Sequence, residues 1–139
     1  KKKTYKNVIL NRISNSPLYK NRSWLIKKKL NIDMMKKGIK FFLGKHDFSS
    51  MRSASCSAKS PIRTISKASL KKKDNKIIII FESKSFLQNQ VRSMVGCLRY
   101  IGEGKWSIQK FDKIIKSKKR TSCAPPAPAE GLYLTKVIY

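Results

Sequence analysis

The chain has 139 residues, which suits one domain or a large part of one. It carries 33 Lys and Arg against 7 Asp and Glu, a formal net charge of +26, and 40% of its residues are hydrophobic. Apolar residues recur at regular spacing, which excludes a disordered basic tail, and no apolar run is long enough to span a membrane. Three scattered cysteines favour a reducing compartment over a disulfide scaffold. Because Lys1 already stands at the edge of a patterned segment, we expect a fragment of a longer protein.

The charge favours a polyanionic partner, and nucleic acid is the first candidate. One alternative is codon bias, since an AT-rich genome also fills solvated surface with lysine. An anionic membrane surface is a second alternative, but no long amphipathic basic helix supports it. Clusters of cations occur at 1–3, 27–29, 71–73 and 116–120. Each cluster by itself is typical of a solvated face or loop.

The first half of the chain predicts one strand and one helix. Strand-forming residues occupy 5–10, and Asn, Ser and Pro indicate a loop over 11–22. Asn31 can cap a helix whose apolar residues recur at helical spacing, and Gly44 stands just past its end. The segment 46–50 then predicts a turn or a short helix.

The second half predicts a hairpin followed by two helices. Residues 62–70 and 77–82 favour strands joined by a polar turn at 71–75. The strongest helical pattern covers 86–100, and Ser107 can cap a further helix.

Three prolines make the segment 123–131 incompatible with a helix or a central strand, and 132–139 predicts a last strand. This order of elements predicts an α+β fold, with a mostly antiparallel sheet and helices packed on one face. Nothing within residues 1–139 marks a domain boundary.

Several chemistries can be excluded. One His and three scattered Cys cannot form a tetrahedral zinc site within the chain, and no glycine-rich phosphate loop is present. Asp47 beside His46 allows acid–base work, but a cap on the following turn is the more economical role for this carboxylate.

Two segments are less ordinary. Residues 86–96 place amides and Arg92 among the apolar positions of a helix, where a cation requires a carboxylate or phosphate partner. The alternative is an arginine that extends to solvent. Residues 124–134 form a stiff proline-rich loop that leads directly into a strand.

Taken in order, six stretches resemble the tRNA pseudouridine synthase A family, the TruA-type enzymes. The resemblance covers essentially the whole chain and corresponds to the C-terminal part of the catalytic domain of that family. The N-terminal part, whose Arg-Thr-Asp-Ala-Gly-Val-His motif supplies the catalytic aspartate, has no counterpart here. The stretches are 2–6, 16–19, 42–50, 59–65, 86–96 and 127–134.

The resemblance implies an RNP-like α+β fold and an isomerase that acts on tRNA without a cofactor or metal. It further implies a cytoplasmic homodimer that acts on uridines 38–40 of the anticodon arm. In this family an aspartate attacks the flipped-out nucleotide, the glycosidic bond breaks, and the base rotates and rejoins through carbon. Because the catalytic aspartate is absent, we expect this chain alone to be inactive.

The resemblance also assigns roles to three residues. Tyr5 matches the tyrosine that lies against the target base, Leu132 matches the apolar residue on another side of it, and Arg92 matches the arginine that pairs with the catalytic aspartate. These roles suit the chemistry, since an unstacked base needs an apolar sandwich and an ionised carboxylate needs a bidentate cation. The chain departs from the family at Asn7, often an aromatic residue, and at 88–90, often a pair of histidines.

The rival interpretation is a non-catalytic basic RNA-binding domain of ribosomal type that shares only the RNP-like architecture. The two interpretations differ in one structural expectation. A catalytic domain brings Tyr5, Arg92 and Leu132 to one pocket, whereas a binding module has no reason to do so.

Overall fold

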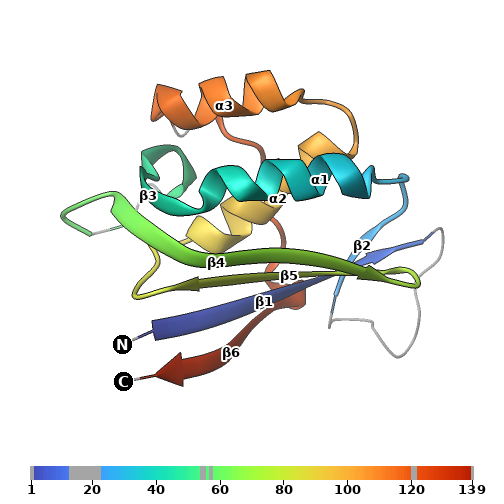
Figure 1. The fold of residues 1–139 in the computed structure, drawn as a ribbon, viewed down its shortest axis with the longest axis horizontal. Coiled ribbons are helices and arrows are strands. Elements are labelled where there is room, and N and C mark those ends of the chain that lie inside the picture. Colours follow the sequence, from blue (N-terminus) through green and yellow to red (C-terminus); the bar gives the residue numbers. More distant parts are fainter. Residues whose placement is uncertain (1, 13–22, 54–55, 57, 120–121, 139) are drawn as a thin grey trace.

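The computed structural model describes residues 2–12, 23–53, 56, 58–119 and 122–138. Within these residues a single sheet carries all the helices on one face (Figure 1). The expected α+β class is therefore confirmed. The strands are β1 (Lys2–Asn11), β2 (Trp24–Ile26), β3 (Gly44–Asp47), β4 (Ile62–Lys73), β5 (Lys76–Ser83) and β6 (Leu132–Ile138). The helices are α1 (Ile32–Ile39), α2 (Gln90–Gly102) and α3 (Ile108–Ser117), with 3₁₀ turns at Lys40–Phe42, Ser49–Met51 and Ala129–Gly131.

β1 pairs with three other strands of the sheet. One of its edges pairs with β5, and β4 and β3 follow in antiparallel order. Its other edge is shared, because β6 pairs antiparallel with its first residues and β2 pairs parallel with its last ones. The sheet is thus antiparallel apart from β2, as expected.

The core lies between the sheet and the helices. β5 alternates strictly, with Ile77, Ile79 and Phe81 fully buried on the helix-covered face and half-buried residues between them. This period of two is what a strand with one covered face requires. From the other layer, Met94 and Leu98 of α2 are equally buried, so the helix lies directly over the sheet.

Both predicted helix caps are present. The side chain of Asn31 accepts a hydrogen bond from the backbone N–H of Met34 at 3.1 Å, and α1 begins at the next residue. The hydroxyl of Ser107 accepts from the backbone N–H of Lys110 at 3.1 Å, and α3 follows it. Each cap satisfies an N–H group that the first turn of a helix leaves without a partner.

The helix expected over 86–100 begins later, at Gln90. Asn89 has a left-handed backbone (φ 70°), which cannot belong to a right-handed helix. The side-chain oxygen of Gln90 accepts the backbone N–H of Leu87 at 2.8 Å and closes a turn in front of the helix. The segment therefore has a helical apolar pattern but forms an ordered turn before α2.

Other boundaries also differ from expectation. The short strand β2 has no counterpart in the sequence-based prediction. A turn or short helix is expected at 46–50, but residues 44–47 form the strand β3. The 3₁₀ turn at Ser49–Met51 is the part of this segment that agrees with the expectation. The polar turn expected over 71–75 shrinks to 74–75, with Asp74 in the left-handed region (φ 55°). The loop expected over 11–22 lies outside the described residues from 13 onward.

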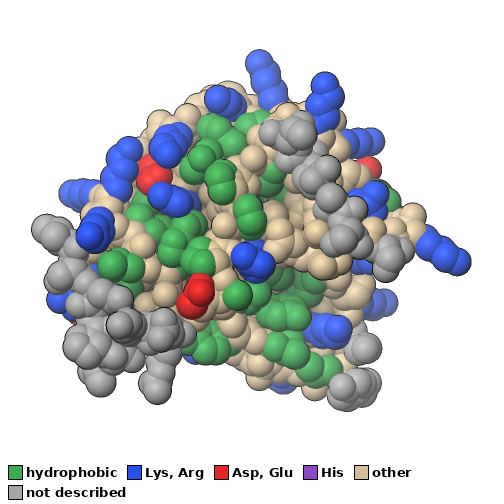
Figure 2. Space-filling view, turned by 180° about the vertical axis from the view of Figure 1, so that it is seen from behind, with side chains coloured by type: hydrophobic (Ala, Val, Ile, Leu, Met, Phe, Trp, Pro, Cys, Tyr) green, Lys and Arg blue, Asp and Glu red, His purple; other side chains and the backbone are tan. Residues whose placement is uncertain are grey.

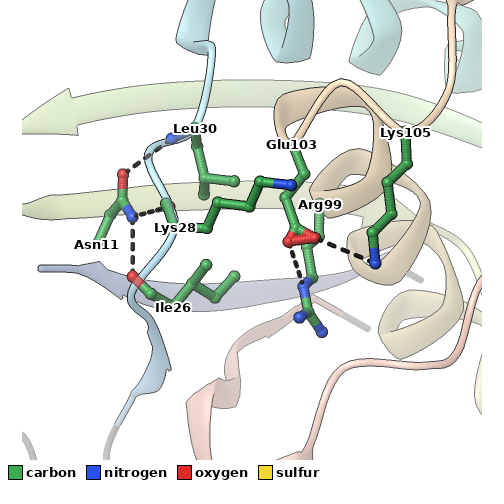
Figure 3. A network of polar contacts seen from close by, with 7 residues as sticks. All are labelled: Asn11, Ile26, Lys28, Leu30, Arg99, Glu103 and Lys105. Atoms are coloured by element: carbon green, nitrogen blue, oxygen red, sulfur yellow. Dashed lines mark hydrogen bonds and ion pairs between the residues drawn. The ribbon is translucent and has the colours of Figure 1, made fainter. Parts of the chain in front are cut away.

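Asn11 fastens the segment between β2 and α1 to the end of β1. Its side-chain nitrogen donates to the carbonyl oxygens of Ile26 and Lys28, each at 2.8 Å (Figure 3). Its side-chain oxygen accepts the backbone N–H of Leu30 at 3.4 Å. One side chain thus bonds three backbone groups of this segment.

The C-terminal end of α2 is fastened to the same region. Glu103 is almost fully buried, and its carboxylate meets Nε of Arg99 at 3.3 Å and Nζ of Lys105 at 3.7 Å (Figure 3). The carbonyl of Gly102 accepts the backbone N–H of Asn31 at 2.8 Å. The bond from Asn31 thus joins the C-terminal end of α2 to the start of α1, while the Glu103 contacts are made within α2 and the residues that follow it.

Candidate functional site

A cavity of about 330 Å³ opens where three elements meet. It lies beside the first residues of β1, the turn that precedes α2 and the first residue of β6. Its lining is Lys3, Tyr5, residues 86–92 and Leu132. All three residues that the sequence assigned to the site therefore line one cavity, which is the arrangement expected of a catalytic domain.

Tyr5 reaches the cavity because of strand alternation. It pairs with Phe81 of β5, so its side chain lies on the helix-covered face of the sheet. Its ring packs against that of Phe86 in a T-shaped arrangement, at a centroid distance of 5.2 Å and an interplanar angle of 83°. Packing of this kind favours one orientation of the Tyr5 ring beside the cavity.

Arg92 stands in the first turn of α2 and is half-buried. Its Nε donates to the backbone carbonyl of Ala127 at 2.6 Å. The N–H of Ala127 in turn donates to the backbone carbonyl of Arg92 at 2.9 Å. The guanidinium is therefore held by one nitrogen, and among the described residues no carboxylate pairs with it. The alternative of an arginine that simply extends to solvent does not describe this side chain.

The proline-rich loop packs tightly on α2 and so positions Ala127. A Cβ added at Gly96 would lie 2.1 Å from the carbonyl oxygen of Pro125, so only glycine permits this approach. Ala124 and Ala127 are buried against the core. The loop is therefore a rigid part of the site and a fixed support for Arg92.

Leu132 follows the loop as the first residue of β6 and pairs with Asn7 of β1. The preceding Gly131 lies so close to β1 that an added Cβ would be 2.7 Å from the carbonyl oxygen of Val8. This close approach sets the depth at which Leu132 enters the sheet, and both Leu132 and Tyr5 line the cavity.

Two amide side chains near the cavity, Gln90 and Asn7, are buried although this residue type is usually exposed. Gln90 is fully buried and is used to close the turn before α2, so the amide is structural. Asn7 is 1% exposed, and neither of its amide atoms has a hydrogen-bond partner within the described part of the chain. It pairs with Leu132 of the neighbouring strand β6.

Asp47 is a cap, as expected. Its carboxylate accepts the backbone N–H and the hydroxyl of Ser49. Burial raises the pKa of this carboxyl, but the two hydrogen bonds and the nearby Lys118 and Arg52 outweigh it, so the pKa lies below its usual value. His46 bonds the carbonyl of Leu43 and takes no part in the cavity.

The chain is strongly basic, with 33 Lys and Arg against 7 Asp and Glu. Figure 2 shows Lys and Arg side chains spread over one side of the molecule, with far fewer acidic ones among them. Among the described residues no group of His, Cys, Asp and Glu could hold a metal ion. Within the same residues no helix is long and apolar enough to cross a membrane.

An α+β domain with this basic surface, and with a cavity that combines an aromatic, an aliphatic and a cationic side chain, indicates a protein that handles nucleotides. Comparison with known proteins makes the class specific. The family model described as tRNA pseudouridine synthase matches residues 39–139. The chain belongs to the tRNA pseudouridine synthase family.

The curated relatives agree with this family. The chain is 58% identical over 139 residues to tRNA pseudouridine synthase A of Pelagibacter ubique. This alignment covers 100% of the chain and 56% of the relative. It is 42% identical over 138 residues to the protein of the same name from Xanthobacter autotrophicus, again covering 56% of the relative. The relative from Parvibaculum lavamentivorans is 40% identical over 138 residues. The chain thus spans little more than half the length of the curated relatives it matches.

The sequence alone missed part of the site. The backbone carbonyl of Ala127 has no side-chain signature, and only its place in the proline-rich loop hinted at a fixed support. Gly96 was part of a matched stretch, but its contact with Pro125 is visible only in the folded chain.

Proposed function

We propose that this chain is the C-terminal part of the catalytic domain of a tRNA pseudouridine synthase that isomerises uridines 38–40 in the anticodon stem-loop. The observation that carries the proposal is the convergence of Tyr5, Arg92 and Leu132 on one cavity of about 330 Å³. A volume of this order lies at the small end of ligand pockets and suits a single base.

In this proposal Tyr5 and Leu132 hold the target uracil. A base taken from its stack loses stacking energy, and aromatic and aliphatic surfaces on either side offset that loss. Tyr5 suits this role because Phe86 fixes its ring at the cavity edge. Leu132 suits it because the close approach of Gly131 to β1 fixes its depth.

Arg92 holds the nucleophile. Its Nε is occupied by Ala127, and its two terminal nitrogens remain available to a carboxylate through two parallel hydrogen bonds. That carboxylate belongs to an aspartate in the N-terminal part of the enzyme. A cation in this position keeps the aspartate ionised, which a nucleophilic carboxylate requires.

The four aspartates of this chain do not supply the nucleophile. Asp47 is occupied by Ser49, Asp33 lies in the first turn of α1, Asp74 in the β4–β5 turn, and Asp112 pairs with Lys116 on α3. None of the four lines the cavity. The chain alone therefore binds RNA but does not isomerise uridine.

A chimera tests the proposal. The 139 residues replace the matching segment of the Pelagibacter ubique relative, and pseudouridine formation is measured in an unmodified anticodon-arm RNA. We expect turnover by the chimera, none by the 139-residue chain alone, and loss of turnover on Tyr5→Ala or Leu132→Ala. Lys72→Ala, on an exposed part of β4, serves as the control that should remain active.

Two outcomes would overturn the proposal. A folded chimera that binds RNA without isomerising it would favour the rival function, a non-catalytic RNA-binding domain of ribosomal type. Turnover by the 139-residue chain alone would place the nucleophile inside it, and Asp47 would be the first residue to substitute.

We also propose that the enzyme acts as a homodimer in the cytoplasm and needs no cofactor or metal, as other members of the family do. Sedimentation of the chimera reports its oligomeric state. Activity after exhaustive dialysis against a chelator tests the metal independence.

A further inference from the structure

Two cysteines that are 26 positions apart in the sequence meet in the fold. The sulfur atoms of Cys97 and Cys123 lie 3.4 Å from one another, and both residues are free thiols. Cys97 belongs to α2 and is fully buried, whereas Cys123 lies at the start of the proline-rich loop and is half-buried. A disulfide requires two sulfur atoms that can approach to about 2 Å, and in this pair the sulfurs are already in contact.

Contacts between α2 and the proline-rich loop hold the backbone near the two cysteines. Arg92, five residues before Cys97, exchanges two hydrogen bonds with Ala127. Gly96, next to Cys97, is in close contact with the carbonyl of Pro125. The loop therefore contacts α2 close to both cysteines, and these contacts keep the two sulfurs near one another.

The two thiols differ in access. Cys123 lines a second cavity of about 400 Å³, together with Arg52, Ser93, Pro125 and others, whereas Cys97 does not line it. The hydrogen bond between the two thiols lowers the pKa of Cys123, and the same bond together with burial raises the pKa of Cys97. Cys123 is thus the thiol that a reagent in the cavity reaches first, and Cys97 stands directly behind it.

We propose that Cys97 and Cys123 form a redox modification site, which a low-molecular-weight disulfide of the glutathione class converts to an intramolecular disulfide. The cavity beside Cys123 suits this reagent, because Arg52 is the charged residue in its lining and oxidised glutathione is an anion. The product joins the proline-rich loop covalently to α2.

The reaction proceeds in two exchanges. The Cys123 thiolate attacks one sulfur of oxidised glutathione, which forms a mixed disulfide and releases one glutathione thiolate. Cys97 then loses its proton and attacks the Cys123 sulfur, which expels the second glutathione. The two protein thiols are oxidised, and the glutathione disulfide is reduced to two thiols.

Cys56 provides an internal comparison. It is half-buried, and no other cysteine sulfur is in contact with it among the described residues. Hydrogen bonds with Ala58 and Gln88 lower the pKa of its thiol. It therefore reacts with oxidised glutathione, but its reaction ends at the mixed disulfide.

This inference stands on the geometry of the thiols and does not depend on the proposed enzymatic activity. It does bear on the same loop, because Ala127 lies four residues after Cys123 and supports Arg92. The disulfide fixes one end of the segment that positions the guanidinium.

The experiment uses the 139-residue chain treated with oxidised glutathione, with peptide mapping by mass spectrometry after the remaining thiols are blocked. We expect a peptide pair joined through Cys97 and Cys123 with the loss of two hydrogens, and a glutathione adduct at Cys56. In Cys97→Ser the reaction at Cys123 should stop at its glutathione adduct. In Cys123→Ser the buried Cys97 should remain a thiol.

A second readout follows the loop. Oxidation should slow hydrogen exchange of the Ala127 amide by about tenfold or more, since the loop opens less often when one end is tethered. Dithiothreitol should restore the original rate. The Cys56→Ser chain should respond identically.

The proposal is overturned if no disulfide between Cys97 and Cys123 is detected once Cys56 is fully glutathionylated. It is also overturned if Cys56 forms a disulfide with Cys97 or Cys123 instead. An adduct that persists at Cys123 in the unaltered chain also contradicts it. Since the unaltered chain carries the primary measurement, the proposal remains testable if a serine variant does not fold. These outcomes are separate from the chimera assay, so either proposal can fail alone.

Discussion

Arg92 and Ala127 are joined by two hydrogen bonds, although 35 positions separate them. Nε of the arginine donates to the alanine carbonyl at 2.6 Å, and the alanine N–H donates to the arginine carbonyl at 2.9 Å. The first bond fixes the side chain and the second fixes the backbone from which it extends. A guanidinium held in this way can present its terminal nitrogens in one direction without a large entropy loss on binding.

Arg92→Lys in the chimera should lower turnover by roughly a hundredfold or more, the usual loss when an oriented donor is removed from a reacting site. Lysine keeps the charge, but it cannot bond the Ala127 carbonyl and also hold a carboxylate through two parallel bonds. The affinity for tRNA should change little, because the role is local. Single-turnover kinetics and a binding isotherm with the same RNA separate the two effects.

Arg99→Lys is the matched control, since Arg99 lies on the same helix and pairs with Glu103 away from the cavity. It should leave turnover within a small factor of the parent chimera. If Arg92→Lys weakened RNA binding in step with activity, Arg92 would be a phosphate contact and its assignment to the aspartate would be wrong.

Gly96→Ala should destabilise the chain by about 1–3 kcal/mol, the usual cost of overpacking. The added methyl meets the Pro125 carbonyl at 2.1 Å, and a backbone atom cannot move aside without displacing the loop. Urea unfolding measures the loss. In the chimera, turnover should fall too, because Ala127 moves with the loop.

Gly38→Ala is the control against which the stability loss of Gly96→Ala is compared. Its methyl would meet the terminal Cδ1 of Ile101 at 2.7 Å, which a rotation can relieve, and alanine favours a helix over glycine by about 1 kcal/mol. A smaller stability loss is therefore expected. Equal losses for the two variants would show that the loop yields easily and does not position Arg92.

RNA affinity should fall steeply with salt. The logarithm of the association constant should drop by roughly 0.7–0.9 for each phosphate neutralised and each tenfold rise in salt concentration. Lys27, Lys28 and Lys29 are all exposed, and replacing them with glutamine should flatten this slope without changing which RNA is preferred. An affinity that barely responds between ~50 and ~200 mM salt would exclude an electrostatic platform on this surface.

Asp47→Asn should reduce stability at neutral pH and have little effect in acid. The pKa of Asp47 is lowered in the folded chain, so the folded state binds its proton less readily than the unfolded state. The carboxylate therefore contributes stability above the unfolded pKa, and this contribution is lost as the pH falls through the folded pKa. Asp47→Ala, which removes the cap at every pH, should cost about 1 kcal/mol near neutrality.

Urea unfolding at several pH values measures this dependence. Asp74→Asn is the control, because it removes the same charge at a turn whose left-handed backbone asparagine tolerates. A stability difference between wild type and Asp47→Asn that stays constant into acid would contradict the role of the ionised carboxylate.

Local signals predicted much of the fold. Asn31 and Ser107 cap helices as expected, because a cap depends on a few consecutive residues. The β4–β5 hairpin also followed from its two apolar runs and the turn between them. The three prolines excluded an α-helix or a central strand over 125–128 for an equally local reason, the missing N–H groups, and the 3₁₀ turn at Ala129–Gly131 begins after the last of them.

Short elements escaped prediction because their partners lie elsewhere in the chain. β2 has only three residues, Trp24–Ile26, and it is a strand because the end of β1 lies beside it. The four residues of β3 depend in the same way on β4. The apolar spacing at 86–89 matched a helix, but the left-handed Asn89 and the side chain of Gln90 make a turn there.

The sequence by itself determined the family, the basic surface and the identity of Tyr5, Arg92 and Leu132 as candidates, because these depend on residue type and order. Only the tertiary structure decided that the three line one cavity, that a backbone carbonyl holds Arg92, and that Cys97 meets Cys123. A main-chain oxygen has no letter in a sequence, and a contact between residues 26 or 35 positions apart exists only once the loop has closed onto α2.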